Sequence, residues 1–142
     1  MIPTAATPAD IPALLICAET AYAPFVPLVG RRPIPTADAF AQDIAAGAVD
    51  LIHAGPVVAG FVVSRPQGTA LLIENIAVAA AGQGLGRCLM AHSEARARAM
   101  GLTHLRLHTS PRISANLTLY PHLGFSRTEV TDTRVSFEKR LV

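Results

Sequence analysis

Apolar and polar residues follow two different periods along this chain of 142 residues. In the first third the apolar positions recur at helical spacing. Thr7 and Asp10, three residues apart with Pro8 between them, predict the start of a helix that runs to about Tyr22. Thr36 begins a second, shorter helix, which Gly47 ends. The segment between the two helices contains several prolines, which break the periodicity.

The pattern then changes to short runs rich in β-branched residues. Residues 49–54 and 57–64, separated by a Gly-Pro pair, predict a hairpin, and residues 70–78 add a third strand. A helical stripe begins at Leu85 and stops at Gly101. The elements predicted after it are a strand at 104–109, a short helix at 113–123 and a closing hairpin. This order is typical of one α+β domain over residues 1–142 with a mixed sheet.

Composition restricts the function classes that this domain can serve. The chain is 51% apolar and 15% charged, with a net charge of +2, and has no basic run, so nucleic acid is not the expected partner. Glu19 and several prolines interrupt the most apolar stretch, so we expect no membrane span and no membrane partner. No leader sequence is visible, which favours a cytoplasmic protein. Cys17 and Cys88 show no ligand spacing, and no metal is expected.

The stretch AAAGQGLGRCLM, residues 79–90, has three glycines at alternate positions between a strand and a helix. Helix N-termini carry backbone N–H groups without partners, and glycine lets an anion approach them closely. Arg87 in the first helical turn opposes the helix dipole, which a nearby anion would explain. The alternative is a tight turn beside a solvated arginine. The dinucleotide-binding pattern does not fit, because Leu89 stands where its third glycine would be. The ATP-loop pattern does not fit either, because it needs Gly-Lys followed by Ser or Thr.

Two motifs resemble the GNAT superfamily of N-acetyltransferases. IENIAVAAAGQGLGRCLM, residues 73–90, is similar to that family's coenzyme A signature, and NLTLYPHLGF, residues 116–125, is similar to its second signature, LYxxxGF. The order of elements also matches over nearly the whole chain, and residues 22–35 and 108–125 are most similar to a branch of small bacterial members. There are two departures, because Ala81 replaces a signature Gln or Arg, and Ile113 stands where the second signature usually has Asn. Asn116 is the nearest asparagine.

The resemblance implies a mostly antiparallel twisted sheet, with helices on both faces and a splayed pair of parallel central strands. Acetyl-CoA would lie between those strands as co-substrate, and a bulge near the end of the first would free its backbone for the pantetheine. One N–H at that edge would hold the thioester oxygen as it gains charge. The implied cofactor-binding residues are Ile76, Ala77, Val78, Gly82, Gln83, Gly84, Leu85, Gly86, Arg87 and Asn116.

Two residues are candidates for catalysis. Deprotonating an amine at pH 7 costs about 4.6 kcal/mol, so a base or a path to water is useful. Glu74 is the acid inside an apolar strand, and strand alternation places it on one face with Ile76 and Val78. The alternative is a carboxylate at a solvated strand edge. Tyr120 matches the family tyrosine that donates to the departing thiolate, or else it only covers the core.

Other polar residues carry weaker predictions. His92 lies on the apolar stripe of the main helix and is expected to be a hydrogen-bonded core residue. His53 and His108 are placed at strand ends that could line a cleft. In the family the connector between the first two helices covers the acceptor, so Arg31 and Arg32 would bind an anionic acceptor there, or else lie in a solvated loop.

Together these observations predict an acetyl-CoA-dependent N-acetyltransferase that acts on a primary amine of a small molecule or peptide. The alternative is a domain of the same fold that binds acyl-CoA as a sensor or partner subunit without turnover. Homodimers are common in the family, although no feature of this sequence specifies one.

Overall fold

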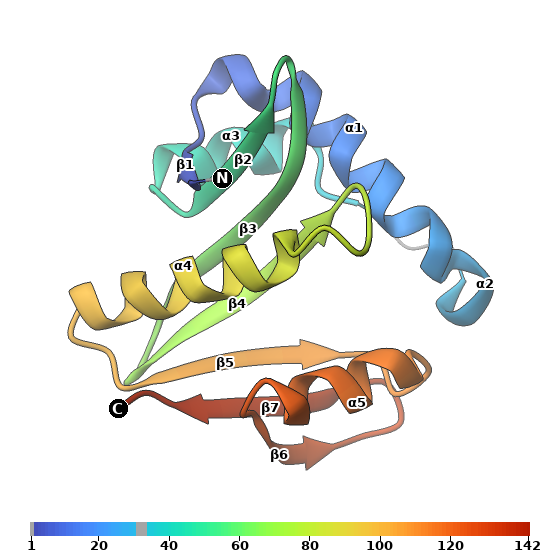
Figure 1. Cartoon of the computed structure of the whole chain (residues 1–142), viewed down its shortest axis with the longest axis vertical. Coiled ribbons are helices and arrows are strands. Elements are labelled where there is room, and N and C mark those ends of the chain that lie inside the picture. The colour runs from blue at the N-terminus through green and yellow to red at the C-terminus, as the bar shows by residue number, and fades with distance from the viewer. Residues whose placement is uncertain (1, 31–33) are drawn as a thin grey trace.

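A single seven-stranded sheet forms the centre of the computed structural model, which describes residues 2–30 and 34–142. The strand order is β1-β2-β3-β4-β5-β7-β6, and every neighbouring pair is antiparallel except the parallel pair β4 and β5. The strands are β1 (Thr4–Ala5), β2 (Val49–Ala54), β3 (Val57–Gln67), β4 (Ala70–Val78), β5 (His104–Thr109), β6 (Ser126–Val130) and β7 (Val135–Arg140). The predicted mixed sheet with a central parallel pair is confirmed (Figure 1).

Helices cover both faces of this sheet. They are α1 (Ile11–Tyr22), α2 (Val26–Val29), α3 (Ala37–Ala45), α4 (Leu85–Ala99) and α5 (Ser114–His122), with 3-10 turns at Pro8–Asp10 and Ala23–Phe25. One buried cluster lies under α1 and α3 and contains Leu14, Phe40 and Phe61. The other lies under α4 and α5 and contains Leu89 and Tyr120. We call these faces the α1 side and the α4 side of the sheet.

Local signals explain why the first helices begin where they do. The Thr7 backbone N–H donates to Asp10 Oδ2 over 2.8 Å, and the Ala39 N–H donates to Thr36 Oγ1 over 3.1 Å. Both helix starts were predicted from these residues. The short helix α2 was not, because its prolines hide any periodicity over a single turn.

The helical run Pro8–Val29 is long and apolar enough to cross a membrane, judged by length and composition alone. In the structure it is divided into two 3-10 turns and two α-helices. Leu14, Cys17 and Ala18 are buried against the sheet, but only 17% of the apolar window is buried in all, and Ile16 is 66% exposed.

Candidate active site

The parallel strands β4 and β5 separate halfway along their length. Their pairing runs from Ala70 opposite His104 to Ile73 opposite Leu107 and then stops, although β4 continues to Val78. Figure 1 shows the two strands joined at one end and diverging toward the loop before α4. Residues 74–78 therefore pair with β3 only, and their edge toward β5 has no strand partner.

A β-bulge lies where the strands separate. Val63 of β3 pairs with Asn75 and Ser64 pairs with Ile73, so Glu74 is the extra residue on β4. A bulge shifts the strand alternation by one residue. Ile76 therefore packs on the α4 side together with Ile73, whereas Ala77 packs on the α1 side.

This bulge corrects one prediction made from the sequence. Glu74 was expected to share a face with Ile76 and Val78 by simple alternation. Val63 and Ser64 are consecutive on β3, but their partners on β4, Asn75 and Ile73, have Glu74 between them. The alternation of side chains along β4 is therefore broken at Glu74 itself.

A cavity of about 610 Å³ reaches both faces of the sheet at this opening. On the α4 side its wall includes Gly84, Gly86 and Arg87 at the start of α4, and Asn116 and Tyr120 on α5. On the α1 side the wall is formed by the end of α1, by the turn after it, and by Ile34 and Pro35. Ile76, Ala77 and Val78 of the unpaired edge also line it.

The glycine loop places backbone amides at one end of this cavity. Gly82 and Gly84 have φ of +79° and +73°, a conformation that favours glycine. The first intrahelical bond of α4 is donated by the Cys88 N–H to the Gly84 carbonyl, so the amides before Cys88 have no partner within the helix. A Cβ on Gly86 would meet no atom within 4 Å, so nothing in the protein requires a glycine at this helical position.

The structure brings together most of the residues predicted to bind a cofactor, with two exceptions. Gln83 does not line the cavity, and the Leu85 side chain is buried in the core under α4. The Arg87 side chain is exposed and, within residues 2–30 and 34–142, makes no ion pair. Asn116 donates from Nδ2 to Thr109 Oγ1 over 3.1 Å, which ties α5 to the free end of β5.

Tyr120 lies deep in the same cavity. Its ring packs edge-on against Phe125 and at a tilt to Phe137, with centroids 5.8 and 5.6 Å away. Burial raises its pKa, which keeps the phenol protonated at neutral pH. Among the residues that the structure describes, none accepts a hydrogen bond from its hydroxyl, so this donor is available to a ligand.

Glu74 does not line the cavity. It is paired with Arg65, whose Nε lies 2.6 Å from Oε1 and whose Nη2 lies 2.9 Å from Oε2. Arg65 also contacts Asp43 Oδ1 at 2.7 Å, and both hydrogen bonds raise the pKa of the guanidinium. The placement matches the predicted alternative of a carboxylate at a solvated strand edge.

His53 and His92 are held in polar pairs away from the cavity wall. His53 Nε2 lies 3.2 Å from Asp10 Oδ1, and His92 Nε2 lies 3.0 Å from Asp50 Oδ2. His92 is thus hydrogen bonded, as predicted, although it is half-buried. Within the described part of the chain no cluster of three metal-ligating residues occurs. Arg31 and Arg32, predicted to face an acceptor, lie outside the described residues.

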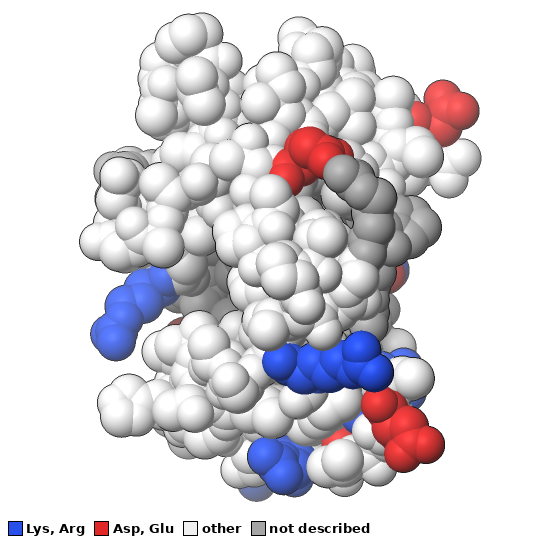
Figure 2. All heavy atoms as spheres, turned by 90° about the vertical axis from the view of Figure 1, so that its right-hand side faces the viewer, with Lys and Arg blue, Asp and Glu red and all other residues white. Residues whose placement is uncertain are grey.

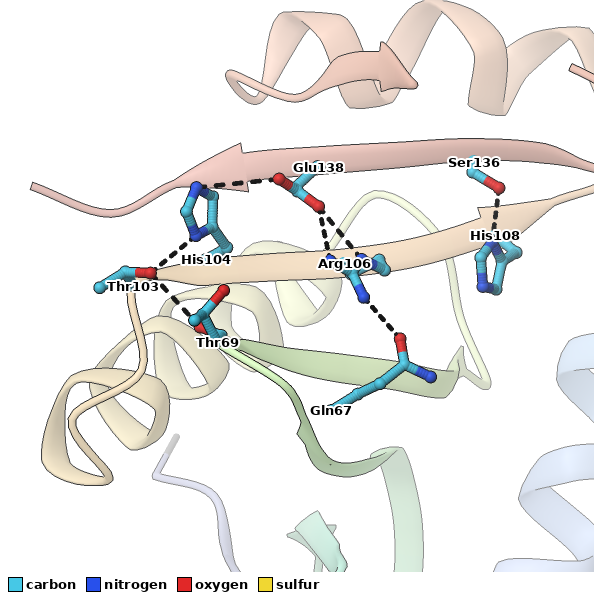
Figure 3. Close-up of polar contacts among 8 residues, drawn as sticks. All are labelled: Gln67, Thr69, Thr103, His104, Arg106, His108, Ser136 and Glu138. Atoms are coloured by element: carbon cyan, nitrogen blue, oxygen red, sulfur yellow. Dashed lines mark hydrogen bonds and ion pairs between the residues drawn. The ribbon is translucent and has the colours of Figure 1, made fainter. Parts of the chain in front are cut away.

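Polar side chains also form a network on β5 and β7, shown in Figure 3. Arg106 donates to Glu138 from Nε and Nη2 and to Gln67 from Nη1. His108 Nδ1 lies 2.8 Å from Ser136 Oγ. Loss of hydration lowers the pKa of His108, and the charges of nearby arginines add to this effect.

Sequence reasoning missed several residues of the cavity wall, among them two with polar side chains. Tyr22, at the end of α1, and Asn75, next to the bulge, both line the α1 side of the cavity. Asn75 follows directly after Glu74, but only the bulge decides which of the two faces the cavity.

A mixed sheet that splits at a central parallel pair, with a helix N-terminus at the opening, defines an acetyltransferase fold. Solved structures share it over nearly their full length. The PaiA N-acetyltransferase from Thermoplasma acidophilum, in complex with coenzyme A, is 13% identical with a TM-score of 0.87, and 98% of each chain is covered. The ribosomal-protein-alanine N-acetyltransferase from Brucella melitensis is 21% identical with a TM-score of 0.78, covering 99% of this chain and 100% of that one. Ard1 from Thermoplasma volcanium is 16% identical with a TM-score of 0.80, covering 99% and 97%.

The family model of the acetyltransferase (GNAT) family matches residues 23–125. The chain therefore belongs to the GNAT acetyltransferase family, as the two sequence motifs predicted.

Proposed function

We propose that this chain is an acetyl-CoA-dependent N-acetyltransferase that moves the acetyl group to a primary amine. The observation that carries the proposal is the cavity, which connects the N-terminus of α4 with the α1 side of the sheet and holds Tyr120 between them. Two structural neighbours support it by name, since one is in complex with coenzyme A and another is a ribosomal-protein-alanine N-acetyltransferase.

The residues at the α4 end fit the diphosphate of such a co-substrate. The backbone amides at the start of α4 have no partner within the helix and can donate hydrogen bonds to an anion. The open space at Gly86 would let phosphate oxygens reach them. Arg87 adds a positive charge that no carboxylate in the described chain neutralises. The free edge of β4, at Ile76 to Val78, offers backbone groups to the pantetheine amides.

The co-substrate supplies an activated thioester. In the transfer the amine nitrogen bonds to the acetyl carbon while the carbon–sulfur bond breaks, giving an N-acetyl amide and the CoA thiol. Tyr120 donates a hydrogen bond to the departing sulfur. Its raised pKa makes full proton transfer uphill, but a charge-assisted hydrogen bond contributes about 1.5–3 kcal/mol.

The amine must also lose a proton. Glu74 is held by Arg65 outside the cavity wall, so we propose that the proton passes to water at the α1 side rather than directly to this carboxylate.

The test is product formation from acetyl-CoA with a broad panel of amines, detected by mass spectrometry. Tyr120→Phe serves as the internal comparison because it keeps the ring packing and removes only the hydroxyl. We expect N-acetyl product and CoA in equal amounts, with turnover reduced in the variant. If CoA binds and no amine gives product, the chain is an acyl-CoA-binding module and the proposal is wrong.

A further inference from the structure

His108 lies beside the opening between the two parallel strands. The pairing of β4 with β5 ends at Ile73 opposite Leu107, and His108 is the next residue of β5. β4 continues past the same point through Asn75, which lines the cavity. Since parallel strands run in the same direction, His108 stands across the opening from this free part of β4.

The side chain of His108 belongs to the α1 side of the sheet. Leu105 and Leu107 are buried in the cluster under α4, and side chains alternate between the two faces along a strand. Tyr120 is buried in that same cluster under α4. His108 and Tyr120 therefore lie on opposite sides of the opening. His108 is on the side from which the proposed amine would approach, because CoA would occupy the α4 end of the cavity.

Ser136 fixes the orientation of the His108 ring. The two residues are opposite each other on β5 and β7, and His108 Nδ1 lies 2.8 Å from Ser136 Oγ. Ser136 is only 5% exposed, so the surrounding packing holds its side chain in place. Figure 3 shows the rest of the ring extending from this contact toward the side of β5 on which β4 lies. When Nδ1 carries the proton and donates to Oγ, the basic lone pair of the ring is on Nε2.

The imidazole of His108 is in the form that accepts a proton at neutral pH. Partial loss of hydration lowers the pKa of His108 below its ordinary value, and Arg134 and Arg106 add to this effect, whereas Glu129 opposes it. Figure 2 looks at the side of the molecule toward which β5 ends, and the charged side chains drawn there are few and interspersed with uncharged ones. Individual neighbours rather than one large charged patch therefore act on the ring.

Glu74, the carboxylate across the opening on β4, is held in an ion pair. Arg65 of β3 contacts both of its oxygens, through Nε at 2.6 Å and through Nη2 at 2.9 Å. Protonation of Glu74 would break this pair, so the carboxylate is a poor base in this position. The partner of His108 is a neutral hydroxyl, so protonation of Nε2 breaks no ion pair with it.

We propose that His108 accepts the proton of the acceptor amine through a water molecule on the α1 side of the opening. This inference deepens the proposed function and rests on it, because it names the base of the same reaction. A bridging water is needed because the His108 side chain is outside the cavity wall. Because the side chain is exposed, it can pass the proton on to solvent.

In this step one N–H bond of the ammonium group breaks, and its proton passes through the water to Nε2 of His108. The freed lone pair forms the bond to the acetyl carbon while the carbon–sulfur bond breaks. A second amine proton ends on the sulfur, which leaves beside the Tyr120 hydroxyl as the CoA thiol. The imidazolium returns to the neutral form by losing its proton to solvent.

The pH dependence of kcat tests the inference. The probe is the primary amine of the broad panel above that the purified wild-type chain acetylates with the highest kcat/KM, at saturating acetyl-CoA. Wild-type kcat is expected to fall on the acid side of pH 6.5 as the ring becomes protonated. His108→Gln keeps a hydrogen-bonding group toward Ser136 but cannot take the proton. It is expected to lower kcat at pH 7 about 100-fold and to remove the acid limb, while the KM for acetyl-CoA stays the same.

His104 offers a matched control. It lies on the same face of β5, and its Nε2 is 3.7 Å from Glu138 Oε1, but it is opposite Ala70 at the closed end of the strand pair. His104→Gln should leave kcat and its pH profile unchanged. Added imidazole should restore part of the rate of His108→Ala, because the exposed position admits a small base, and should not affect His104→Ala. Ser136→Ala should lower kcat about 2- to 10-fold, because the ring loses its orienting hydrogen bond.

Unchanged kcat and an unchanged pH profile in His108→Gln overturn the inference and leave the proposed function standing. A loss that His104→Gln shares, or that imidazole does not restore in His108→Ala, also overturns it, because either result shows a structural effect. Absence of product from the wild-type chain with every amine of the panel overturns the proposed function and this inference together.

Discussion

Gly86 gives the sharpest test, because stability and binding are expected to change in opposite directions. The residue lies in the first turn of α4 with helical φ, and a Cβ there would meet no protein atom within 4 Å. Alanine is favoured over glycine in a helix by about 0.5–1 kcal/mol. Gly86→Ala should therefore stabilise the free protein and raise its Tm by about 1–4 °C for a domain of this size.

The same methyl group would occupy the cavity at the helix N-terminus. If the CoA diphosphate approaches the unpaired amides there, the added carbon pushes it away from at least one charge-assisted hydrogen bond. Such a bond contributes about 1.5–3 kcal/mol, which corresponds to about a 10- to 150-fold increase in the Kd for CoA. Gly86→Val should weaken binding further, because two more carbons enter the same space.

Differential scanning fluorimetry of the free protein and calorimetric titration with CoA measure the two effects separately. Ala95→Val is the matched control, since it adds similar bulk to an exposed position of the same helix outside the cavity. The control should bind CoA like the wild type. If Gly86→Ala and Gly86→Val bind CoA as tightly as the control, the diphosphate does not approach this helix end and the reasoning fails.

Four further results are expected. Tyr120→Phe should lower kcat by about 10- to 100-fold with little change in the Kd for CoA, and unchanged turnover would remove its role as donor. Glu74→Gln should change kcat less than threefold while it lowers the Tm, because the carboxylate is paired with an arginine outside the cavity; a large loss of kcat would contradict this. The imidazole of His108 should titrate below pH 6.5 in NMR spectra, so the folded protein should lose stability as the pH falls below 6.5, and His108→Gln should lose less. The pKa of Cys17 is raised to about 11 by burial, so its thiol should resist alkylation at pH 8 until the chain unfolds, as mass spectrometry of the labelled protein would show.

Local signals in the sequence predicted the order of the elements well. Capping residues, glycine turns and strand periodicity act within a few residues, so Thr36, Gly47 and the run 70–78 determine their elements almost alone. The glycine loop was recognisable for the same reason. By contrast, the position of β7 between β5 and β6 depends on contacts far apart in the sequence, which no local pattern reports.

The bulge at Glu74 shows why the candidate site was harder to predict. Period-two alternation assumes regular pairing, and one extra residue reverses the face of everything after it. The sequence therefore drew attention to the charged residue, whereas the structure places its neighbour Asn75 in the cavity wall. Tyr22 was missed for a related reason, since only the packing of α1 across the sheet brings it near the opening.

The most direct test of the account is a crystal structure of the chain with CoA bound. We expect the diphosphate within hydrogen-bond distance of the backbone amides at the start of α4, the pantetheine along the free edge of β4, and the sulfur beside the Tyr120 hydroxyl. CoA bound elsewhere on the chain, or an opening between β4 and β5 closed by side chains in the complex, would contradict it.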